Sequence, residues 1–155
     1  MGQTLELDIV LYQPEIPQNT GNIGRTCVAL GARLWLVQPL GFQLDEKRLQ
    51  RAGLDYWQHL QWQLVPDWRS LQASLGAERA YWYFSRHGTR SLYDVRFPAG
   101  SILVFGSESH GLPESLLQHD PRRVVMIPMP GPTRSLNLAN AVAVAGYEAY
   151  RQLKR

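Results

Sequence analysis

The sequence predicts an α/β domain with a mostly parallel sheet that is covered by helices on both faces. Short apolar runs alternate with segments of helical character along the chain, and this alternation is typical of parallel sheets. The 155 residues are 45% hydrophobic and 19% charged, as in ordinary globular proteins. We therefore expect residues 1–155 to form one domain.

The first two strands are the clearest. The apolar runs Leu7–Tyr12 and Leu34–Val37 are typical of buried strands, and the segment between them is long enough for a helix. A strand–helix–strand unit of this length predicts a parallel pair with a right-handed crossover.

The segment between these strands predicts a loop and then a helix. Pro14 and Pro17 favour an extended loop, because each proline fixes φ and lacks an N–H donor. Residues 19–21 can cap a helix that runs from about residue 22 to residue 30, with Gly31 as its C-terminal stop.

The rest of the chain continues the alternation. The further expected strands are residues 58–64, 80–84, 102–105 and 124–127. The further expected helices are residues 67–75, 113–117 and 138–153.

The last expected helix is apolar or small on most of its faces, with Asn140, Glu148 and Arg151 among its few polar residues. Such a helix is normally buried all round. In so small a protein this predicts packing against a partner subunit.

Composition limits the class of protein. Cys27 is the single cysteine, so it has no disulfide partner in the chain and no second cysteine for a zinc site. The N-terminus lacks a basic region followed by an apolar run, and no stretch approaches about 18 apolar residues. These features predict a cytoplasmic protein that does not enter a membrane. The net charge of +3 permits a polyanionic partner.

Several common site fingerprints are absent from the sequence. It has no GxGxxG, and the loop from Gly106 to Gly111 is not followed by the Lys and Ser or Thr of a phosphate-binding loop. The four histidines lie in separate segments without metal-ligand spacing, so no metal is expected. No GxSxG elbow supports a hydrolase.

Glycine and polar residues directly follow three of the expected strands, at residues 85–88, 106–111 and 128–132. Ligands of open α/β sheets bind outside the carboxyl ends of the strands, and glycine lets backbone amides approach a ligand. Three such loops can line one pocket. Each loop alone is equally typical of an ordinary turn.

Arg25 is expected in the first turns of the first helix, where it can hold a phosphate beside the positive helix end. An arginine on the solvated face of a helix is the alternative. Residues 135–140 likewise have an ordinary interpretation, as the cap of the last helix.

Three motifs together resemble a known family. They are NxGNxxR at residues 19–25, FGSExxGLP at residues 105–113 and IPMxGxxxSLNLANAVAV at residues 127–144. In this order they resemble the signature motifs of the SPOUT RNA methyltransferases. The short chain and the segments at residues 11–25 and 41–56 are similar to the subgroup that methylates the ribose of the tRNA wobble nucleotide, a cytidine or a modified uridine.

The resemblance implies a deep C-terminal trefoil knot, a homodimer and S-adenosylmethionine as the methyl donor. Knots are rare exceptions to ordinary chain topology. The positions that the resemblance assigns to the cofactor are Phe84, Gly106, Glu108, Gly111, Ile127, Met129, Ser135, Leu136 and Asn137. Relatives often have leucine at the position of Phe84.

The resemblance also assigns the catalytic arginine to Arg25. Because arginine is effectively always protonated, we expect Arg25 to steer the target phosphate and to stabilise developing alkoxide charge. The proton acceptor stays open. The candidate helpers are Asn22, Ser135, Asn137 and Tyr147.

The expected RNA partner is the anticodon stem-loop of tRNA. We expect a base to stack on Tyr56 or Trp57. The candidate phosphate contacts are Lys47, Arg48, Arg51, Arg86, Arg90 and Arg134, and solvated surface charge is the alternative for each. Two other functions stay open: a SPOUT enzyme that methylates ribosomal RNA or another tRNA position, and a non-catalytic RNA-binding dimer.

Overall fold

The computed structural model describes residues 6–45, 47 and 55–154. Within them, parallel strands form one sheet in the order β3-β2-β1-β6-β4-β7-β5, which confirms the predicted α/β class. The strands are β1 (Leu7–Tyr12), β2 (Arg33–Val37), β3 (Trp62–Val65), β4 (Tyr81–Phe84), β5 (Arg90–Ser91), β6 (Ser101–Phe105) and β7 (Val124–Met126).

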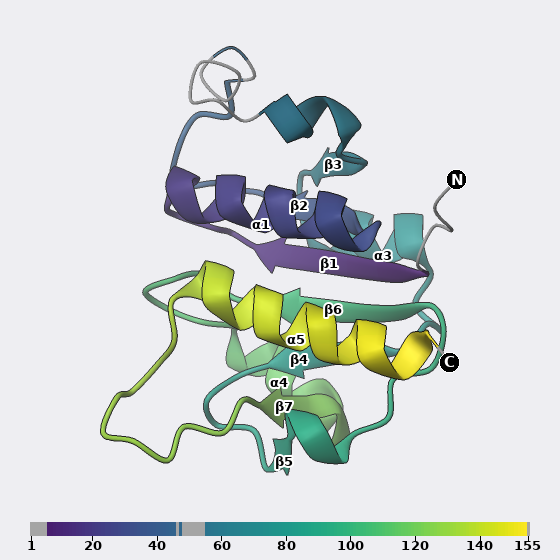
Figure 1. Ribbon diagram of the computed structural model, residues 1–155, viewed down its shortest axis with the longest axis vertical. Coiled ribbons are helices and arrows are strands. Elements are labelled where there is room, and N and C mark those ends of the chain that lie inside the picture. Colours follow the sequence, from purple (N-terminus) through teal and green to yellow (C-terminus); the bar gives the residue numbers. More distant parts are fainter. Residues whose placement is uncertain (1–5, 46, 48–54, 155) are drawn as a thin grey trace.

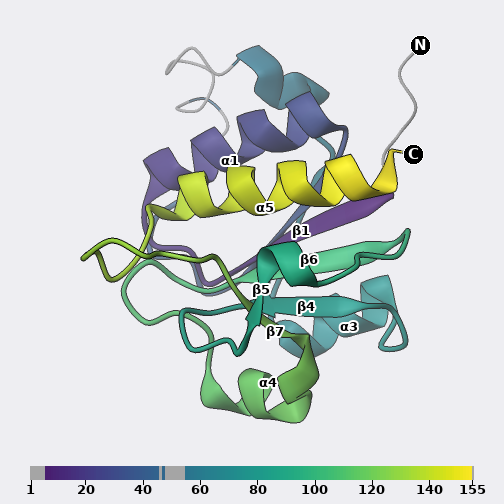
Figure 2. The same ribbon diagram turned by 60° about the horizontal axis from the view of Figure 1, so that its bottom comes forward.

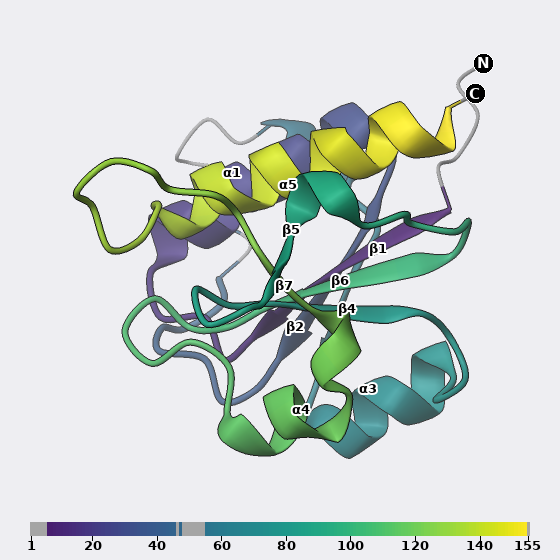
Figure 3. The same ribbon diagram turned by 90° about the horizontal axis from the view of Figure 1, so that it is seen from below.

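Helices cover both faces of this sheet, as predicted. The α-helices are α1 (Pro17–Leu30), α3 (Trp68–Leu75), α4 (Glu114–His119) and α5 (Leu138–Leu153), and the 3-10 helices are η1 (Asp55–His59), η2 (Leu92–Asp94) and η3 (Pro121–Arg123). Helices α1 and α5 lie side by side on one face, whereas α3 and α4 lie on the other (Figures 1, 2 and 3). None of the described helices is long and apolar enough to cross a membrane.

An apolar core lies on each side of the sheet, because successive side chains of a strand point to opposite faces. Ile9 and Leu103 pack with Ile23 and Val142 on the α1 and α5 side. Their neighbours in the strands, such as Val104, pack with α3 on the other side. Two faces buried in this way explain why the strands are continuous apolar runs rather than alternating ones.

Helix α5 occupies the predicted residues, but its own chain does not bury it all round. Gly146 lets it approach α1 closely, since a Cβ at this position would lie 2.8 Å from the Leu30 Cδ1 atom. Ala145 and Ala149 are fully buried against the core. Val144 and Tyr147 are 37% and 49% exposed. The described residues therefore leave an apolar strip of α5 uncovered.

The predicted start of the first helix was wrong. Helix α1 begins at Pro17, directly after its N-cap residue Ile16, rather than at about residue 22. Proline is favourable as the first residue of a helix, because its fixed φ suits the helix and its missing N–H would have had no partner there. As a result Arg25 lies in the middle of α1, and the proposed help from the helix end does not apply to it.

One further expectation for the middle of the chain was wrong, and one strand was missed. The strand expected over residues 58–64 begins at Trp62, and η1 precedes it. Trp57 and Leu60 are both buried, and the Leu60 N–H donates to the Trp57 carbonyl at 3.1 Å, which is a helical turn. Strand β5 was not predicted, because two residues at a sheet edge leave no apolar run to detect.

A fully buried carboxylate holds the amino edge of the sheet. Asp8 accepts hydrogen bonds of 2.8 Å from the Arg33 and Arg79 guanidinium groups and from the Trp35 indole. Arg79 also donates to the Gly100 carbonyl at 2.6 Å. This amino-edge cluster (Asp8, Arg33, Trp35 and Arg79) joins β1, β2 and the segment before β4.

Candidate functional site

A pocket of about 720 Å³, here the main pocket, lies where β4, β6 and β7 end and α5 begins. The loops that form it follow these strands and can be traced in Figures 2 and 3. All nine residues that the sequence assigned to a cofactor line it, namely Phe84, Gly106, Glu108, Gly111, Ile127, Met129, Ser135, Leu136 and Asn137. Asn19 of the first motif lines the pocket as well, so residues from three distant motifs share one cavity.

The loop after β6 forms a tight wall of the main pocket. Gly106 has no room for a side chain, since a Cβ there would lie 2.1 Å from the carbonyl carbon of Gly111. The Gly111 N–H donates to the Ser107 carbonyl at 2.9 Å, and Gly111 has a φ of 66° that favours glycine. The loop therefore doubles back on itself and brings backbone groups to the pocket.

The floor of the main pocket is aromatic and apolar. The rings of Phe84 and Phe105 stack at a centroid distance of 4.7 Å with an angle of 10° between their planes. Both rings are almost fully buried, and Ile127 and Leu138 line the pocket beside them. Such a floor suits a flat, largely apolar group.

One hydrogen-bonded network joins the three motifs. The Glu108 carboxylate accepts from the backbone N–H groups of Glu15 and Ile16 at 2.8 and 2.9 Å, and from the Asn19 amide at 3.2 Å. Asn19 in turn accepts from the Asn137 amide at 3.1 Å. We call Asn19, Glu108 and Asn137 the motif network. It ties the start of α1 to both pocket loops.

Asn137 has a second role at the start of α5. Its Oδ1 atom accepts from the backbone N–H groups of Ala139 and Asn140 at 2.9 and 3.3 Å, so it caps the helix. The predicted cap of the last helix is therefore present. The same side chain lines the pocket, caps the helix and holds Asn19.

Glu15 holds the loop after β6 from the other side, and sequence reasoning missed this residue. Its Oε1 atom accepts from the backbone N–H of Ser109 at 3.0 Å and from the Ser109 hydroxyl at 2.5 Å. Hydrogen bonds from the side chain and backbone of Ser109 hold the pKa of the Glu15 carboxyl below its ordinary value. The partners are 94 positions apart, so no local pattern could have paired them.

The proposed catalytic residues fall into two groups. Ser135 and Asn137 line the main pocket, whereas Arg25, Asn22 and Tyr147 do not. The exposed guanidinium of Arg25 lies 5.7 Å from the ring centroid of Tyr56, whose hydroxyl donates to the Gly21 carbonyl at 2.6 Å. Burial raises the pKa of Tyr56, and the charge of Arg25 opposes this shift. Arg25 is thus held on α1, outside its own chain's pocket.

The proposed RNA contacts are also divided. Arg86 is exposed and lines the main pocket, and Arg134 is exposed in the loop before α5. Arg90 donates to the Arg122 carbonyl at 3.0 Å at the edge strand. Lys47 is exposed, and Arg48 and Arg51 lie outside the described residues.

The expectation that Trp57 could stack on an RNA base was wrong. Its side chain is 5% exposed and packs on α1, where a Cβ on Gly24 would lie 2.6 Å from its ring. The 3-10 turn of η1 directs Trp57 into the core and leaves Tyr56 half-buried at the surface. Of the two aromatic candidates, Tyr56 alone remains accessible.

Cys27 is buried in the core of the described fold. Burial raises the pKa of the Cys27 thiol to about 12, so it is a poor nucleophile. No group of three or more His, Cys, Asp or Glu side chains in the described part of the chain could hold a metal ion.

Comparison with known proteins gives consistent matches. The model of the SpoU rRNA Methylase family matches residues 6–147. A tRNA (cytidine(34)-2'-O)-methyltransferase of Methylovorus glucosotrophus is 47% identical over 146 residues, which cover 94% of each chain. A solved structure described as "Structural insights into the 2-OH methylation of C/U34 on tRNA" is 53% identical with a TM-score of 0.89, and covers 96% of each chain.

A more distant structure carries a cofactor. The SpoU methyltransferase AviRb from Streptomyces viridochromogenes, in complex with AdoMet, is 28% identical with a TM-score of 0.77; the match covers 98% of this chain and 59% of that one. The family model covers most of the described fold, including both motif loops of the main pocket. The chain therefore belongs to the SpoU methylase family.

Proposed function

We propose that this protein transfers a methyl group from S-adenosylmethionine to the ribose 2′-hydroxyl of the wobble nucleotide of tRNA, a cytidine or a 5-carboxymethylaminomethyluridine. The observation that carries the proposal is the convergence of three motif segments on one pocket, in a chain that matches a tRNA (cytidine(34)-2'-O)-methyltransferase along 94% of its length. A tRNA substrate also implies a cytoplasmic location. The trefoil knot stays a prediction.

The main pocket fits the proposed methyl donor. Its volume of about 720 Å³ lies within the range of roughly 300–1,000 Å³ found for small-molecule sites. The apolar floor with Phe84, Ile127 and Leu138 suits an adenine, and the backbone of the glycine loop offers hydrogen-bonding groups. AviRb, a structural neighbour, binds AdoMet.

The chain's residues then have distinct tasks. When bound, S-adenosylmethionine supplies a methyl group on a positively charged sulfur. The pocket must align the ribose oxygen with that methyl group, and alignment supplies much of the rate. Ser135 and Asn137 line the pocket and can orient the ribose, while the permanent charge of Arg25 steers a phosphate and stabilises the developing alkoxide.

A homodimer completes the site in this proposal. Val144 and Tyr147 form the uncovered apolar strip of α5, which a second copy can bury. Arg25 lies on α1, beside α5, and does not line its own chain's main pocket. We therefore place Arg25 of each subunit at the main pocket of the other.

The decisive experiment maps the methylated nucleotide. The protein is incubated with total tRNA and labelled S-adenosylmethionine, and the labelled nucleoside is identified. We expect label in the ribose of the wobble nucleotide. Label in a base or at another position would contradict the assignment, and label in ribosomal RNA alone would favour the rRNA alternative. If calorimetric titration with S-adenosylmethionine showed no binding, the non-catalytic RNA-binding dimer would be favoured.

Arg25→Ala tests the catalytic assignment. We expect methyl transfer to fall by about 100-fold, a typical loss for one charge-stabilising donor, while the Kd of the cofactor stays within about twofold. Arg69→Ala is the matched control, since Arg69 is an exposed arginine of α3 on the other side of the sheet. Full activity of Arg25→Ala would remove Arg25 from the mechanism.

Mixed dimers test the placement of Arg25. Arg25→Ala and Gly106→Ala subunits are co-expressed with different tags, and each variant alone should be nearly inactive. Random pairing makes half of the dimers mixed, each with one intact site, so activity should recover to about one quarter. No recovery would mean that Arg25 serves the pocket of its own chain.

A further inference from the structure

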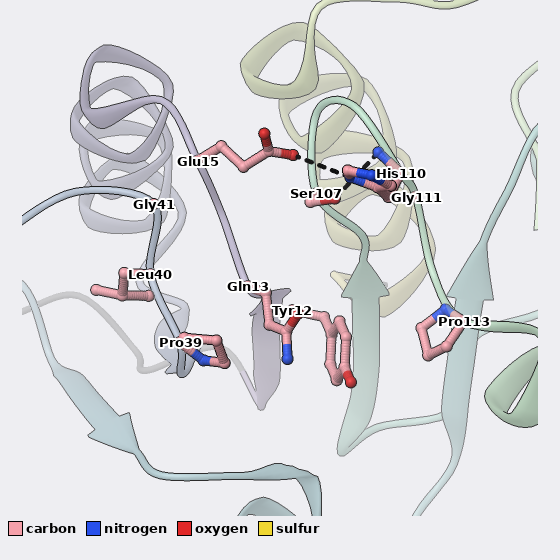
Figure 4. A pocket seen from close by; sticks show the side chains of 10 residues that line it. All are labelled: Tyr12, Gln13, Glu15, Pro39, Leu40, Gly41, Ser107, His110, Gly111 and Pro113. Atoms are coloured by element: carbon pink, nitrogen blue, oxygen red, sulfur yellow. Dashed lines mark hydrogen bonds and ion pairs between the residues drawn. The ribbon is translucent and has the colours of Figure 1, made fainter.

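A second cavity, here the side pocket, lies next to the main pocket where β1 and β2 end (Figure 4). Its volume is about 360 Å³, and its walls are the loops that follow β1, β2 and β6. Ser107, His110, Gly111 and Pro113 line both cavities. The loop after β6 is thus a shared wall, and a ligand that extends out of the main pocket has the side pocket as its neighbour.

The side pocket is held in shape by backbone contacts. The Gln13 N–H donates to the Val37 carbonyl at 2.9 Å, and the Gly41 N–H donates to the Pro14 carbonyl at 2.9 Å. Gly41 has no room for a side chain, since a Cβ there would lie 2.8 Å from the Glu15 Cα atom. The hydrogen bonds from Ser109 to Glu15 attach the third wall, the loop after β6, to the loop after β1. A cavity formed in advance loses little entropy on binding.

The lining suits an uncharged, flat group. Tyr12, Pro39, Leu40 and Pro113 offer apolar surface, and the described lining includes neither lysine nor arginine. The carboxylate of Glu15 would repel a phosphate. Both Ser109 bonds use the Oε1 atom of Glu15, so Oε2 retains capacity to accept a hydrogen bond from a ligand donor such as an amino group.

Besides Glu15, Gln13 supplies a polar side chain to the side pocket, and its backbone is strained. Its φ of 53° lies in the left-handed region, which a residue other than glycine adopts at a cost. Figure 4 shows its amide between Pro39 and Tyr12, and no hydrogen bond joins this amide to another described residue. An amide offers both a donor and acceptor, the combination that reads the edge of a nucleobase.

We infer that the side pocket binds one unpaired base of the RNA, from the nucleotide next to the methylated one, and that Gln13 and Glu15 recognise its amino group. The inference rests on the proposed function, because an RNA must first place a ribose at the main pocket. Bases of a single-stranded loop can splay apart and enter separate protein pockets. Substrate choice would then depend on the neighbouring base as well as on the target.

Gln13→Gly is the variant that tests this inference. Glycine adopts the observed φ without strain, so the variant should fold at least as well as the parent. We expect the Kd for an anticodon stem-loop RNA to rise about tenfold, as for the loss of one or two hydrogen bonds, with no change in the Kd of the cofactor. Gln43→Gly is the matched control, because Gln43 lies exposed in the neighbouring loop and lines neither pocket.

A scan of abasic nucleotides identifies the bound base. Removal of one base adjacent to the target should raise the Kd of the RNA for the parent protein about tenfold. The same removal should not change the Kd for Gln13→Gly. Two results would overturn the side-pocket inference alone, provided that the parent methylates RNA. One is a Gln13→Gly variant that binds the RNA with the parent Kd. The other is a Gln13→Gly variant that loses as much affinity as the parent when the base is removed. Absence of methyl transfer by the parent to any RNA would overturn the proposed function and, with it, the inference that rests on it.

Discussion

The two edges of the sheet use carboxylates in different ways. At the amino edge, Asp8 is fully buried and meets three side-chain donors at 2.8 Å. At the carboxyl edge, Glu108 also meets three donors, but it is half-buried and lines the main pocket. Because all strands are parallel, the loops that follow them gather at one edge. The amino edge therefore carries a buried, hydrogen-bonded cluster, whereas the carboxyl edge carries both a hydrogen-bonded network and the main pocket.

Asp8→Asn should have the largest effect on folding. It removes the charge that faces two guanidinium groups and leaves one donor without an acceptor, so we expect a loss of about 3 kcal/mol in the free energy of unfolding. Cofactor affinity of the folded protein should not change. Denaturant unfolding measures the first and calorimetry the second. Asp94→Asn, at an exposed position, is the control, and an equal loss in both variants would contradict the role of Asp8.

Glu108→Gln should cost less stability but should also weaken binding. Glutamine replaces one of the two acceptor oxygens by an NH2 donor, so one of the two backbone N–H groups loses its acceptor. We expect a loss of about 2 kcal/mol in the free energy of unfolding and a rise of about tenfold in the cofactor Kd. Glu78→Gln, an exposed position, controls for the substitution. An unchanged Kd would show that the motif network does not shape the pocket, and the contrast between the edges would then fail.

Asn137→Ala should remove about 1 kcal/mol, the usual value of a helix cap. Asn137→Ser separates the two roles of this residue, because serine can cap α5 but is too short to hold Asn19. We expect both variants to raise the cofactor Kd, because neither can hold Asn19. The unfolding temperature should return to the parent value in Asn137→Ser but not in Asn137→Ala. If the serine variant had both the parent unfolding temperature and the parent cofactor Kd, capping α5 would be the single role of Asn137.

The smallest effect concerns Glu15 and depends on pH. Because the folded-state pKa is lowered from the ordinary value of 4.5, the Ser109 bonds stabilise the protein above that pH, and this contribution is lost as the pH falls through the folded pKa. The unfolding temperatures of the parent and Glu15→Gln should therefore differ near neutral pH and converge in acid. Ser109→Ala should narrow the same gap. A gap independent of pH would contradict the assignment.

Much of the fold could be predicted because it depends on local patterns. Buried strands such as Leu7–Tyr12 are continuous apolar runs, and α5 has a helical composition from end to end. Predictions failed where a local pattern allows two structures. Pro17 is compatible with a loop and with the first turn of a helix, and residues 58–59 with a strand and with a 3-10 turn.

The site shows the same division. Its nine predicted lining residues come from loops next to apolar strands and from motifs that resemble a known family, and the structure brings them to one pocket. Glu15, the side pocket and the motif network were not predicted. Each depends on which loops become neighbours once the strands have paired.

By itself, the sequence determined the strand and helix alternation, the loops that carry the site and the family. The alternation of buried and exposed positions and the conformational freedom of glycine depend on a few neighbouring residues, so they can be recognised in the sequence. The tertiary structure alone decided that Asn19 meets Asn137, 118 positions away, and that Glu15 closes a second pocket. The physical reason is that strand order selects these partners, and hydrogen bonds between loops form only after the sheet has placed both ends.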